Sequence, residues 1–386
     1  MRVLRAPTER FALALAALGA FGTVLECLAD VRRGFTVYLA AFGFLASTAL
    51  GGLILQMTMH ACAARWFVVL RRLCEAIAGS ALLVPIFFAP IAFGLRFLYP
   101  WARSDALLDT VTRESLAHAR SWLSPRPFFW HTLFYFFVWL GFTEFLRRAS
   151  LAEDRGRVGR ANRALQGVSA VGLPVMAFVG SFAVFDWLMS SVPGWTSSIV
   201  GLRVLVGGFG SALGVLAIAL QLARRSQLLP SQVGAAHVHA LGRLLLTATC
   251  LWAYLAASEL IIVWSANLPR EVPFFLARWQ GAARGLSWVL IVGHFALPFV
   301  LLLVRSLKRR AAQMAWLGAW LCLMHAVDMY WLVVPTVSTR VSVLDLAPFL
   351  LVSAAGAWLM RARFARAPAL PLSAPDLAHS LSYESP

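Results

Sequence analysis

Long apolar runs separated by short polar segments make up most of this sequence of 386 residues. Each run has about the ~20 residues that an α-helix needs to cross the hydrocarbon core of a membrane. The pattern predicts an all-α integral membrane protein with about ten transmembrane helices. The predicted spans are residues 11–29, 35–58, 76–97, 127–146, 168–190, 199–223, 242–266, 285–304, 311–336 and 343–361.

The composition agrees with this class, because 60% of the residues are hydrophobic and only 13% are charged. The net charge of +17 does not indicate a nucleic-acid partner, since the basic residues, almost all Arg, lie in short clusters between apolar runs. Most of them fall on the loops that share one side with the two chain ends. By the positive-inside rule, both termini are predicted to be cytoplasmic.

The chain ends differ in character. Met1–Arg10 carries three Arg residues ahead of an apolar run, as a signal peptide does, but the run is long and has no convincing cleavage site. A retained first helix is therefore expected. The tail at 367–386, rich in Pro, Ser and Ala, is expected to be disordered.

A short motif occurs twice. Asp186 and Asp328 each follow an Ala-Val pair, lie beside aromatic residues and precede a Pro, Pro193 or Pro335, by seven positions. The two acids are four spans apart, so the repeated units run in the same direction. The predicted division is a peripheral helix at 1–34, four-helix bundles at 35–190 and 191–336 (helices 2–5 and 6–9), a last helix at 337–366 and the tail.

Acidic residues inside the spans are the main functional candidates, because a charge in the bilayer is costly. At ~1.5 Å per residue, Asp328, Glu259 and Glu26 lie roughly 24–27 Å from the cytoplasmic side, and Asp186 is at a similar level. His325 shares a helix face with Asp328, and no His stands so close to Asp186 along its own helix.

Other titratable residues lie at different depths. His60, Glu75 and Glu144 are near the cytoplasmic side, and His294 lies between the two levels. A proton relay needs such groups at several depths. The alternative for Glu26, Glu75 and Glu144 is pairing with nearby Arg residues or contact with the interface. No catalytic residue is predicted, and the predicted proton-transfer residues are Asp328, His325, Glu259, Tyr254, Asp186, His294, His60 and Glu75.

No cofactor site is predicted for this chain. The five Cys residues show no CxxC or CxxCH spacing, which argues against zinc, iron–sulfur and covalent haem sites. His60, His294 and His325 lie at different depths and so do not form an axial haem pair. His237 and His239 lie in a predicted loop and are expected to be surface or proton-uptake residues.

Seven motifs in a fixed order resemble the F subunit of alternative complex III, a bacterial quinol:cytochrome c oxidoreductase that passes electrons to cytochrome c or to a terminal oxidase. That subunit is similar to the polysulfide-reductase-type (NrfD-like) membrane subunits. The motifs are YPWAR (Tyr99–Arg103), FDWLMS (Phe185–Ser190), HVHALGRLL (His237–Leu245), WAYLAASE (Trp252–Glu259), NLP (Asn267–Pro269), VGHFALPF (Val292–Phe299) and MHAVDMYWL (Met324–Leu332).

The resemblance implies paired four-helix bundles in a subunit of the bacterial inner membrane. It implies that this chain binds no cofactor, whereas quinol or quinone, haem c and iron–sulfur clusters are expected in partner subunits, including a homologous membrane subunit. It also implies a role in assembly and in proton transfer coupled to quinol oxidation. Met59, Ala240 and Glu259 depart from the pattern of the family.

Two other interpretations remain open. A stand-alone secondary transporter would have its site between the repeats and helices interrupted by Gly or Pro, for which Gly207, Gly208, Gly210 and Pro298 are candidates. A subunit that oxidises quinol itself would need a quinone pocket beside a redox partner.

Overall fold

The computed structural model describes residues 5–384 apart from 105–107, 109, 118, 157 and 193. In this part of the chain every regular element is a helix, which confirms the all-α class. The longer helices are α1 (Arg5–Ala29), α2 (Val31–Ala61), α3 (Arg71–Ala78), α4 (Val84–Phe93), α6 (Thr110–Ala117), α7 (Pro125–Glu153), α8 (Val158–Trp187), α9 (Val200–Arg225), α10 (Ala235–Ala266), α12 (Gly281–Val289), α15 (Ala311–Val333) and α16 (Leu346–Phe364). Short helices connect them: η1 (Arg65–Leu70), η2 (Gly79–Leu83), α5 (Leu95–Leu98), η3 (Pro100–Ala102), η5 (Met189–Ser191), α11 (Val272–Arg278), η6 (Leu290–Ala296), α13 (Leu297–Leu303), α14 (Arg305–Lys308), η7 (Val334–Thr336), η8 (Val343–Asp345) and α17 (Leu377–Leu381).

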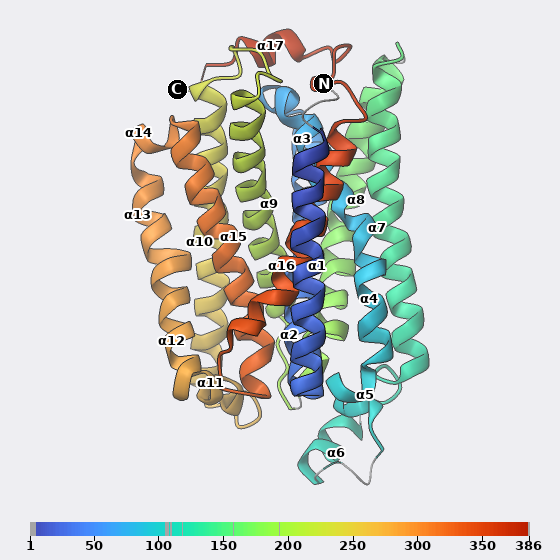
Figure 1. Ribbon diagram of the computed structural model, residues 1–386, viewed down its shortest axis with the longest axis vertical. Coiled ribbons are helices and arrows are strands. Elements are labelled where there is room, and N and C mark those ends of the chain that lie inside the picture. Colours follow the sequence, from blue (N-terminus) through green and yellow to red (C-terminus); the bar gives the residue numbers. More distant parts are fainter. Residues whose placement is uncertain are drawn as a thin grey trace.

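Nine helices or helix runs within the described residues are long and apolar enough to cross a membrane, which identifies a multi-pass membrane fold. They correspond to nine of the ten predicted spans. The remaining one, α7, has 29 residues but a more polar sequence that includes Trp130, His131, Tyr135 and Glu144. It lies alongside α8 over most of its length (Figure 1).

The long helices run nearly parallel or antiparallel to one another, and both described chain ends lie at one end of the molecule (Figure 1). We call this the terminal end, and it also carries η1, α14 and α17. The opposite end, which carries α5, α6 and α11, is called the loop end. The acids Asp186 and Asp328 both lie toward the loop end, since α8 and α15 run down from the terminal end.

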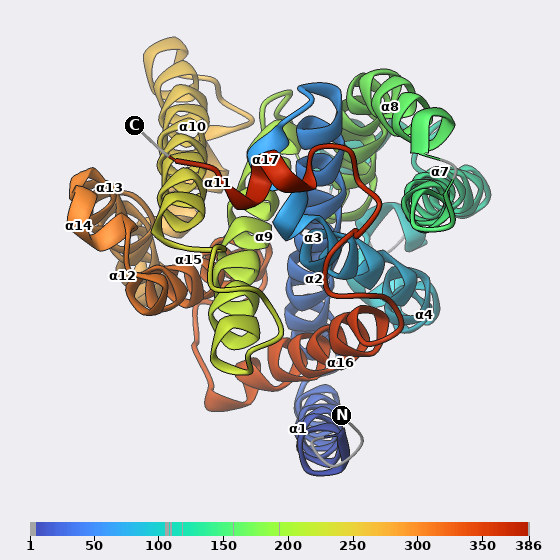
Figure 2. The ribbon, with the colours of Figure 1, turned by 90° about the horizontal axis from the view of Figure 1, so that it is seen from above.

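Figure 2 shows how the helices are grouped. We name α2, α3–α4, α7 and α8 the first group, and α9, α10, α12–α13 and α15 the second group. The members of the two predicted bundles lie on opposite sides in this view, and α1 and α16 lie outside them. Pro193 of the predicted repeat lies outside the described residues, and the repeat itself stays a prediction.

The two groups meet where α2 crosses α9, and glycine makes this approach possible. A Cβ at Gly208 would lie 2.1 Å from the carbonyl oxygen of Ser47, and a Cβ at Gly51 would lie 2.2 Å from that of Gly208. Small residues let helix backbones approach closely in membranes, where van der Waals packing stabilises helix pairs. Any larger residue at these positions would push the groups apart.

Capping groups in the sequence set several helix ends. The side chain of Asp30 accepts a hydrogen bond from the backbone N–H of Arg33 at the start of α2. Asn267 ends α10 in the left-handed conformation (φ 45°). Ser342 and Asp345 form a capping box at η8, which leads directly into α16.

The eighth predicted span is interrupted, because Pro298 has no N–H to donate to the carbonyl of His294. The preceding residues form the π-helical segment η6, and Leu297 N–H bonds to the carbonyl of Val292. A π-bulge is a typical local response to such a break and often occurs at functional sites. By contrast, α9 continues unbroken through Gly207, Gly208 and Gly210.

The expectation of a disordered tail is wrong for residues 367–384. This segment lies across the terminal end, where α17 packs against η1 (Figure 2). Ser380 is fully buried, and its Oγ donates to the carbonyl of Trp66 at 2.9 Å. Leu370 and Ala374 are also buried, so the tail has apolar contacts that its composition did not indicate.

Candidate functional site

Asp328 lies in the interior of the second group beside an indole and an imidazole. Trp252 Nε1 on α10 donates to Asp328 Oδ2 at 2.9 Å. The indole of Trp252 stacks on the ring of His294 from η6, with centroids 3.9 Å apart. Three helices therefore meet around one buried carboxylate. Asp328 Oδ1 and His294 Nδ1 have no hydrogen-bond partner among the described residues.

One helical turn from Asp328 toward the terminal end, His325 links the second group to the first. Its Nε2 lies 2.8 Å from Ser47 Oγ on α2, and the ring is completely buried. Gly207 on α9 provides the space for this ring, because a Cβ there would lie 2.7 Å from His325 Nδ1. The electrostatic neighbours of His325 include Asp328 and His294. The predicted pair of His325 and Asp328 thus lies at the contact between the groups.

Toward the loop end, Glu259 on α10 faces Arg203 on α9, with Nη1 and Oε2 3.8 Å apart. Both side chains are buried. The guanidinium of Arg203 lies over the ring of Trp331, 5.3 Å from its centroid. Arg203 is not among the residues predicted from sequence, because only acidic residues, histidines and hydroxyl-bearing residues within the spans were considered candidates. Its position just inside an apolar run, where the next helix begins, was the available signal.

Most of the residues around Asp328 have a buried polar atom without a hydrogen-bond partner in the described part of the chain, as do Arg71, Arg72 and Glu153 at the terminal end. Buried polar groups in proteins are nearly always hydrogen-bonded to protein or to ordered water. Unpaired atoms grouped in one region are therefore places for ordered water to bind. We call the residues around Asp328 the Asp328 cluster. Their unpaired atoms among the described residues are Arg203 Nε and Nη2, Glu259 Oε1, His294 Nδ1, His325 Nδ1 and Asp328 Oδ1.

Asp186 in the first group has a different environment. Trp122 Nε1 donates to its Oδ1 and Tyr135 OH donates to its Oδ2, each at 2.7 Å. His131 Nδ1 lies 3.3 Å from the same Oδ2 and forms an ion pair when the ring is protonated. Sequence reasoning found a His only beside Asp328, because His131 comes from another helix, α7. Both carboxylate oxygens of Asp186 are thus occupied by protein donors.

The candidates at the terminal end form an ion-pair network. Glu75 accepts from Arg72 Nη1 at 2.8 Å and from Ser150 Oγ at 2.5 Å, and it also faces Arg71 at 3.7 Å. Glu144 pairs with Arg363 at the same end, whereas Glu26 pairs with Arg33 near the loop end, where α1 ends and α2 begins. All three glutamates therefore pair with Arg residues, which is the alternative to a proton-relay role that the sequence left open for them. His60 is separate from these pairs, and its Nδ1 lies 3.4 Å from Ser169 Oγ.

Two positions differ from expectation. Tyr254 does not join the Asp328 cluster, because its side chain is 67% exposed on the outer face of α10. His237 and His239 are not surface loop residues, because both are buried in the first turns of α10. The tail covers His237, whose Nε2 lies 2.8 Å from the carbonyl oxygen of Ser380.

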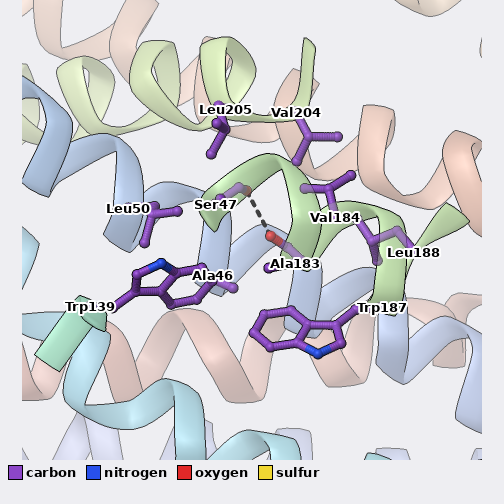
Figure 3. A pocket seen from close by; sticks show the side chains of 12 residues that line it. Ala46, Ser47, Leu50, Trp139, Ala183, Val184, Trp187, Leu188, Val204 and Leu205 are labelled. Carbon is purple, nitrogen blue, oxygen red and sulfur yellow. Dashed lines mark hydrogen bonds between the residues drawn. The ribbon is translucent and has the colours of Figure 1, made fainter. Parts of the chain in front are cut away.

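A small apolar pocket lies where α2, α7, α8 and α9 meet (Figure 3). Its volume of about 20 Å³ is enough for one water molecule but not for a quinone ring. Ser47, the partner of His325, lies on its wall, and so does Trp139, whose buried Nε1 has no partner among the described residues.

Metal and cofactor ligands are not grouped in the part of the chain that the structure describes. It contains no set of three or more His, Cys, Asp or Glu side chains placed to hold a metal ion. The five cysteines are free thiols. No protein-family model matches this chain, and no curated protein matches it.

Proposed function

We propose that this chain is an integral membrane subunit of a quinol:cytochrome c oxidoreductase of the alternative complex III type. In this proposal it binds no cofactor, supports assembly and transfers protons coupled to quinol oxidation by partner subunits. Haem and iron–sulfur subunits and a homologous membrane subunit are its partners in the bacterial inner membrane. The seven motifs of the sequence support the family, and the Asp328 cluster supports proton transfer.

The observation that carries the proposal is the group of unpaired buried atoms around Asp328. Glu259, Asp328, His294 and His325 each have two protonation states, and each presents at least one atom without a protein partner. Water molecules between these atoms provide a route for proton hops. Arg203 Nη1 lies 3.8 Å from Glu259 Oε2 at the loop end of the cluster.

The two repeated acids have different roles in this proposal. Asp328 has one oxygen held by Trp252 and one free to exchange a proton with water. Asp186 has both oxygens held, by Trp122 and Tyr135 from segments outside α8. Asp186 therefore acts mainly in assembly, since it fixes the connection before α7 and α7 itself against α8.

The test compares Asp328→Asn with Asp186→Asn in the complex reconstituted into vesicles. Asparagine keeps the shape of the side chain but does not ionise. We expect Asp328→Asn to lower the number of protons released per electron. Tyr254→Phe, on the outer face of α10, is the matched control and is expected to leave this ratio unchanged. An assembled Asp328→Asn complex with unchanged electron transfer and unchanged proton release would refute the proton route.

Orientation and cofactor content are tested separately. The proposal has both termini in the cytoplasm, so a Cys placed at Ser306 should react with reagents from the cytoplasmic side and one at Ser104 from the opposite side. Both positions are exposed. The chain purified away from its partners should show no haem absorbance, and a stoichiometric b-type spectrum would contradict the proposal.

One observation favours a second candidate, a stand-alone secondary transporter. The π-helical segment η6 interrupts a membrane span at His294, and transporters often bind substrates at interrupted helices. Purification in a mild detergent distinguishes the two functions. Migration with haem- and iron–sulfur-containing partners supports the oxidoreductase subunit. A chain that migrates alone and binds a solute supports the transporter.

A further inference from the structure

The terminal end of the second group carries many cations and few acids. The sequence has no Asp or Glu between Asp186 and Glu259, and none between Glu271 and Asp328. The tail that crosses this end contributes Asp376, which lies 3.4 Å from Arg65, and Glu384. The basic residues that these helices and loops bring to this end are Arg224, Arg225, Arg243, Arg305, Lys308, Arg309 and Arg310.

Lys308 is the only lysine in the sequence, and it is nearly buried, with 7% of its surface exposed. It lies on α14, which packs against α10 at the terminal end (Figure 1). Its side-chain stem lies against Gly242, where a Cβ would come within 2.8 Å of Lys308 Cγ. Lys308 makes no side-chain hydrogen bond or ion pair with any residue that the structure describes.

The charge of Arg243 acts on Lys308, and Arg305 and Arg309 share the neighbour His239 with it. His239, which is 5% exposed and has an unpaired Nδ1, lies within electrostatic range of Lys308, Arg243, Arg305 and Arg309. Burial, and then the charge of Arg243, lower the pKa of Lys308 below its ordinary value. We call Lys308, His239, Arg243, Arg305 and Arg309 the Lys308 cluster.

A topological role does not explain this arrangement. The positive-inside rule requires Lys and Arg in the loops, but it does not require that any of them be buried. A lysine that is 7% exposed, lies beside other cations and has no acidic partner among the described residues is unfavourable unless an anion compensates its charge. The packing of Lys308 against Gly242 therefore indicates a site that is completed by an anion from outside the chain.

The position of the cluster identifies the chemistry of that anion. One membrane span ends at Leu303 and the next begins at Ala311, so Lys308 lies at the membrane surface between them. Directly before α14, the apolar side chains of Val300, Leu303 and Val304 are about half exposed. A ligand here has a negative headgroup next to the cations and acyl chains next to these side chains. Basic pockets between transmembrane helices bind anionic lipid headgroups in this manner.

We propose that the Lys308 cluster is a specific binding site for the phosphate of an anionic phospholipid. The site is independent of the oxidoreductase function proposed above. Its occupant neutralises the charge of Lys308 and joins α10, α14 and the start of α15 at the membrane surface.

The test is a lipid titration of the delipidated full-length chain, followed by native mass spectrometry. Phosphatidylglycerol should bind more tightly than phosphatidylcholine. A cation near an anionic lipid contributes about 1 kcal/mol, so Lys308→Gln or Arg305→Gln should weaken phosphatidylglycerol binding about fivefold. The double variant should lose about 30-fold if the two contributions add. Lys308→Arg keeps the charge and should bind within about twofold of the original chain, because the salt bridge to a headgroup is retained.

Arg160→Gln is the matched control, because Arg160 is an exposed cation in the first turn of α8, which begins at the terminal end. An equal loss in this variant, or equal binding of the two lipids by the original chain, would overturn the proposal. If Lys308→Gln does not fold, the exposed Arg305 and Arg309 provide the same comparison.

A footprint at the single lysine separates lipid from free phosphate. Acetylation of Lys308 should slow about twofold when phosphatidylglycerol is added to phosphatidylcholine vesicles at the concentration that half-saturates the site, because the bound headgroup covers the amine. Excess inorganic phosphate should not reproduce this protection. Protection by inorganic phosphate without protection by the lipid would show that the site takes a soluble anion, and would refute the lipid assignment.

Discussion

Ser47 Oγ and His325 Nε2 lie 2.8 Å apart, although 278 positions separate them in the sequence. This contact connects α2 of the first group with α15 of the second, next to the place where Gly208 brings α9 against α2. The Asp328 cluster is therefore not enclosed within one group. The side of the cluster nearest the terminal end contacts the hydroxyl of Ser47, which belongs to the other group.

Ser47→Ala should destabilise the protein, because it removes the hydrogen-bond partner of His325 Nε2. The other ring nitrogen already has no partner among the described residues. A buried polar group without a partner costs about 1–3 kcal/mol. The expected result is a lower thermal unfolding midpoint for the purified chain in detergent. Ser80→Ala is the control, since Ser80 Oγ donates only to the carbonyl of Ile77 in its own turn, and equal losses would contradict the prediction.

Gly207→Ala should displace the ring of His325. The new Cβ would lie 2.7 Å from Nδ1, and the buried ring has little room to move. Overpacking of this kind costs about 1–3 kcal/mol. At Gly210, three residues later on the same helix, a Cβ meets nothing closer than Ala248 Cβ at 3.6 Å. Gly210→Ala should therefore be neutral or stabilising by up to ~1 kcal/mol.

A comparison of unfolding midpoints for the two glycine variants tests this prediction. Proton release per electron provides a second measurement, which should fall only for Gly207→Ala. If both alanines raise the midpoint equally, His325 does not occupy the position described here.

Ser380→Ala should release the tail from the terminal end. Ser380 Oγ donates to the carbonyl of Trp66 and accepts from the N–H of Val69 at 3.2 Å, so both backbone groups would lose their partner. Local opening should become easier by about 1–3 kcal/mol, and proteolysis reports the open population. Trypsin should then cleave after Arg366 faster. Ser382→Ala is the control, because Ser382 Oγ bonds only to carbonyls of its own helix.

The spans could be predicted from sequence because the signal is local: a run of ~20 apolar residues is enough to identify each one. The arrangement across helices could not be predicted in this way. His131 lies on α7 and Ser47 on α2, and nothing near Asp186 or His325 in the sequence indicates these partners. The π-helical form of η6 likewise depends on local geometry, although Pro298 indicated a break.

Helical periodicity already separates Tyr254 from the acidic residues with which it was grouped. At about 100° per residue, Trp252 lies on the same face of α10 as Glu259, seven residues later, whereas Tyr254 lies about 140° away. The structure accordingly buries Trp252 beside Asp328 and leaves Tyr254 exposed. The tail was mispredicted for another reason. Its few apolar residues are too sparse to form a core alone, but they bury against the helix bundle.

Arg278→Lys should destabilise the loop end of α15, where a proline leaves backbone groups without partners. Pro335 has no N–H, so the carbonyl of Trp331 lacks the donor that would normally come four residues later. Arg278, which is fully buried, replaces it: Nε donates to that carbonyl at 2.9 Å, and Nη2 donates to the carbonyl of Leu332 at 2.6 Å. The guanidinium also lies over the ring of Phe274, 3.4 Å from its centroid.

Lysine keeps the positive charge but not the planar fork of donors, so it cannot bond both carbonyls of α15 and stack on the ring at once. Hydrogen bonds to charged groups contribute about 1.5–3 kcal/mol each, and the expected loss is therefore about 3 kcal/mol or more. Arg284→Lys, at an exposed position on α12, should change the unfolding midpoint little. If Arg278→Lys unfolds at the same temperature as the original chain, the guanidinium fork does not stabilise the end of α15, and water must serve these carbonyls instead.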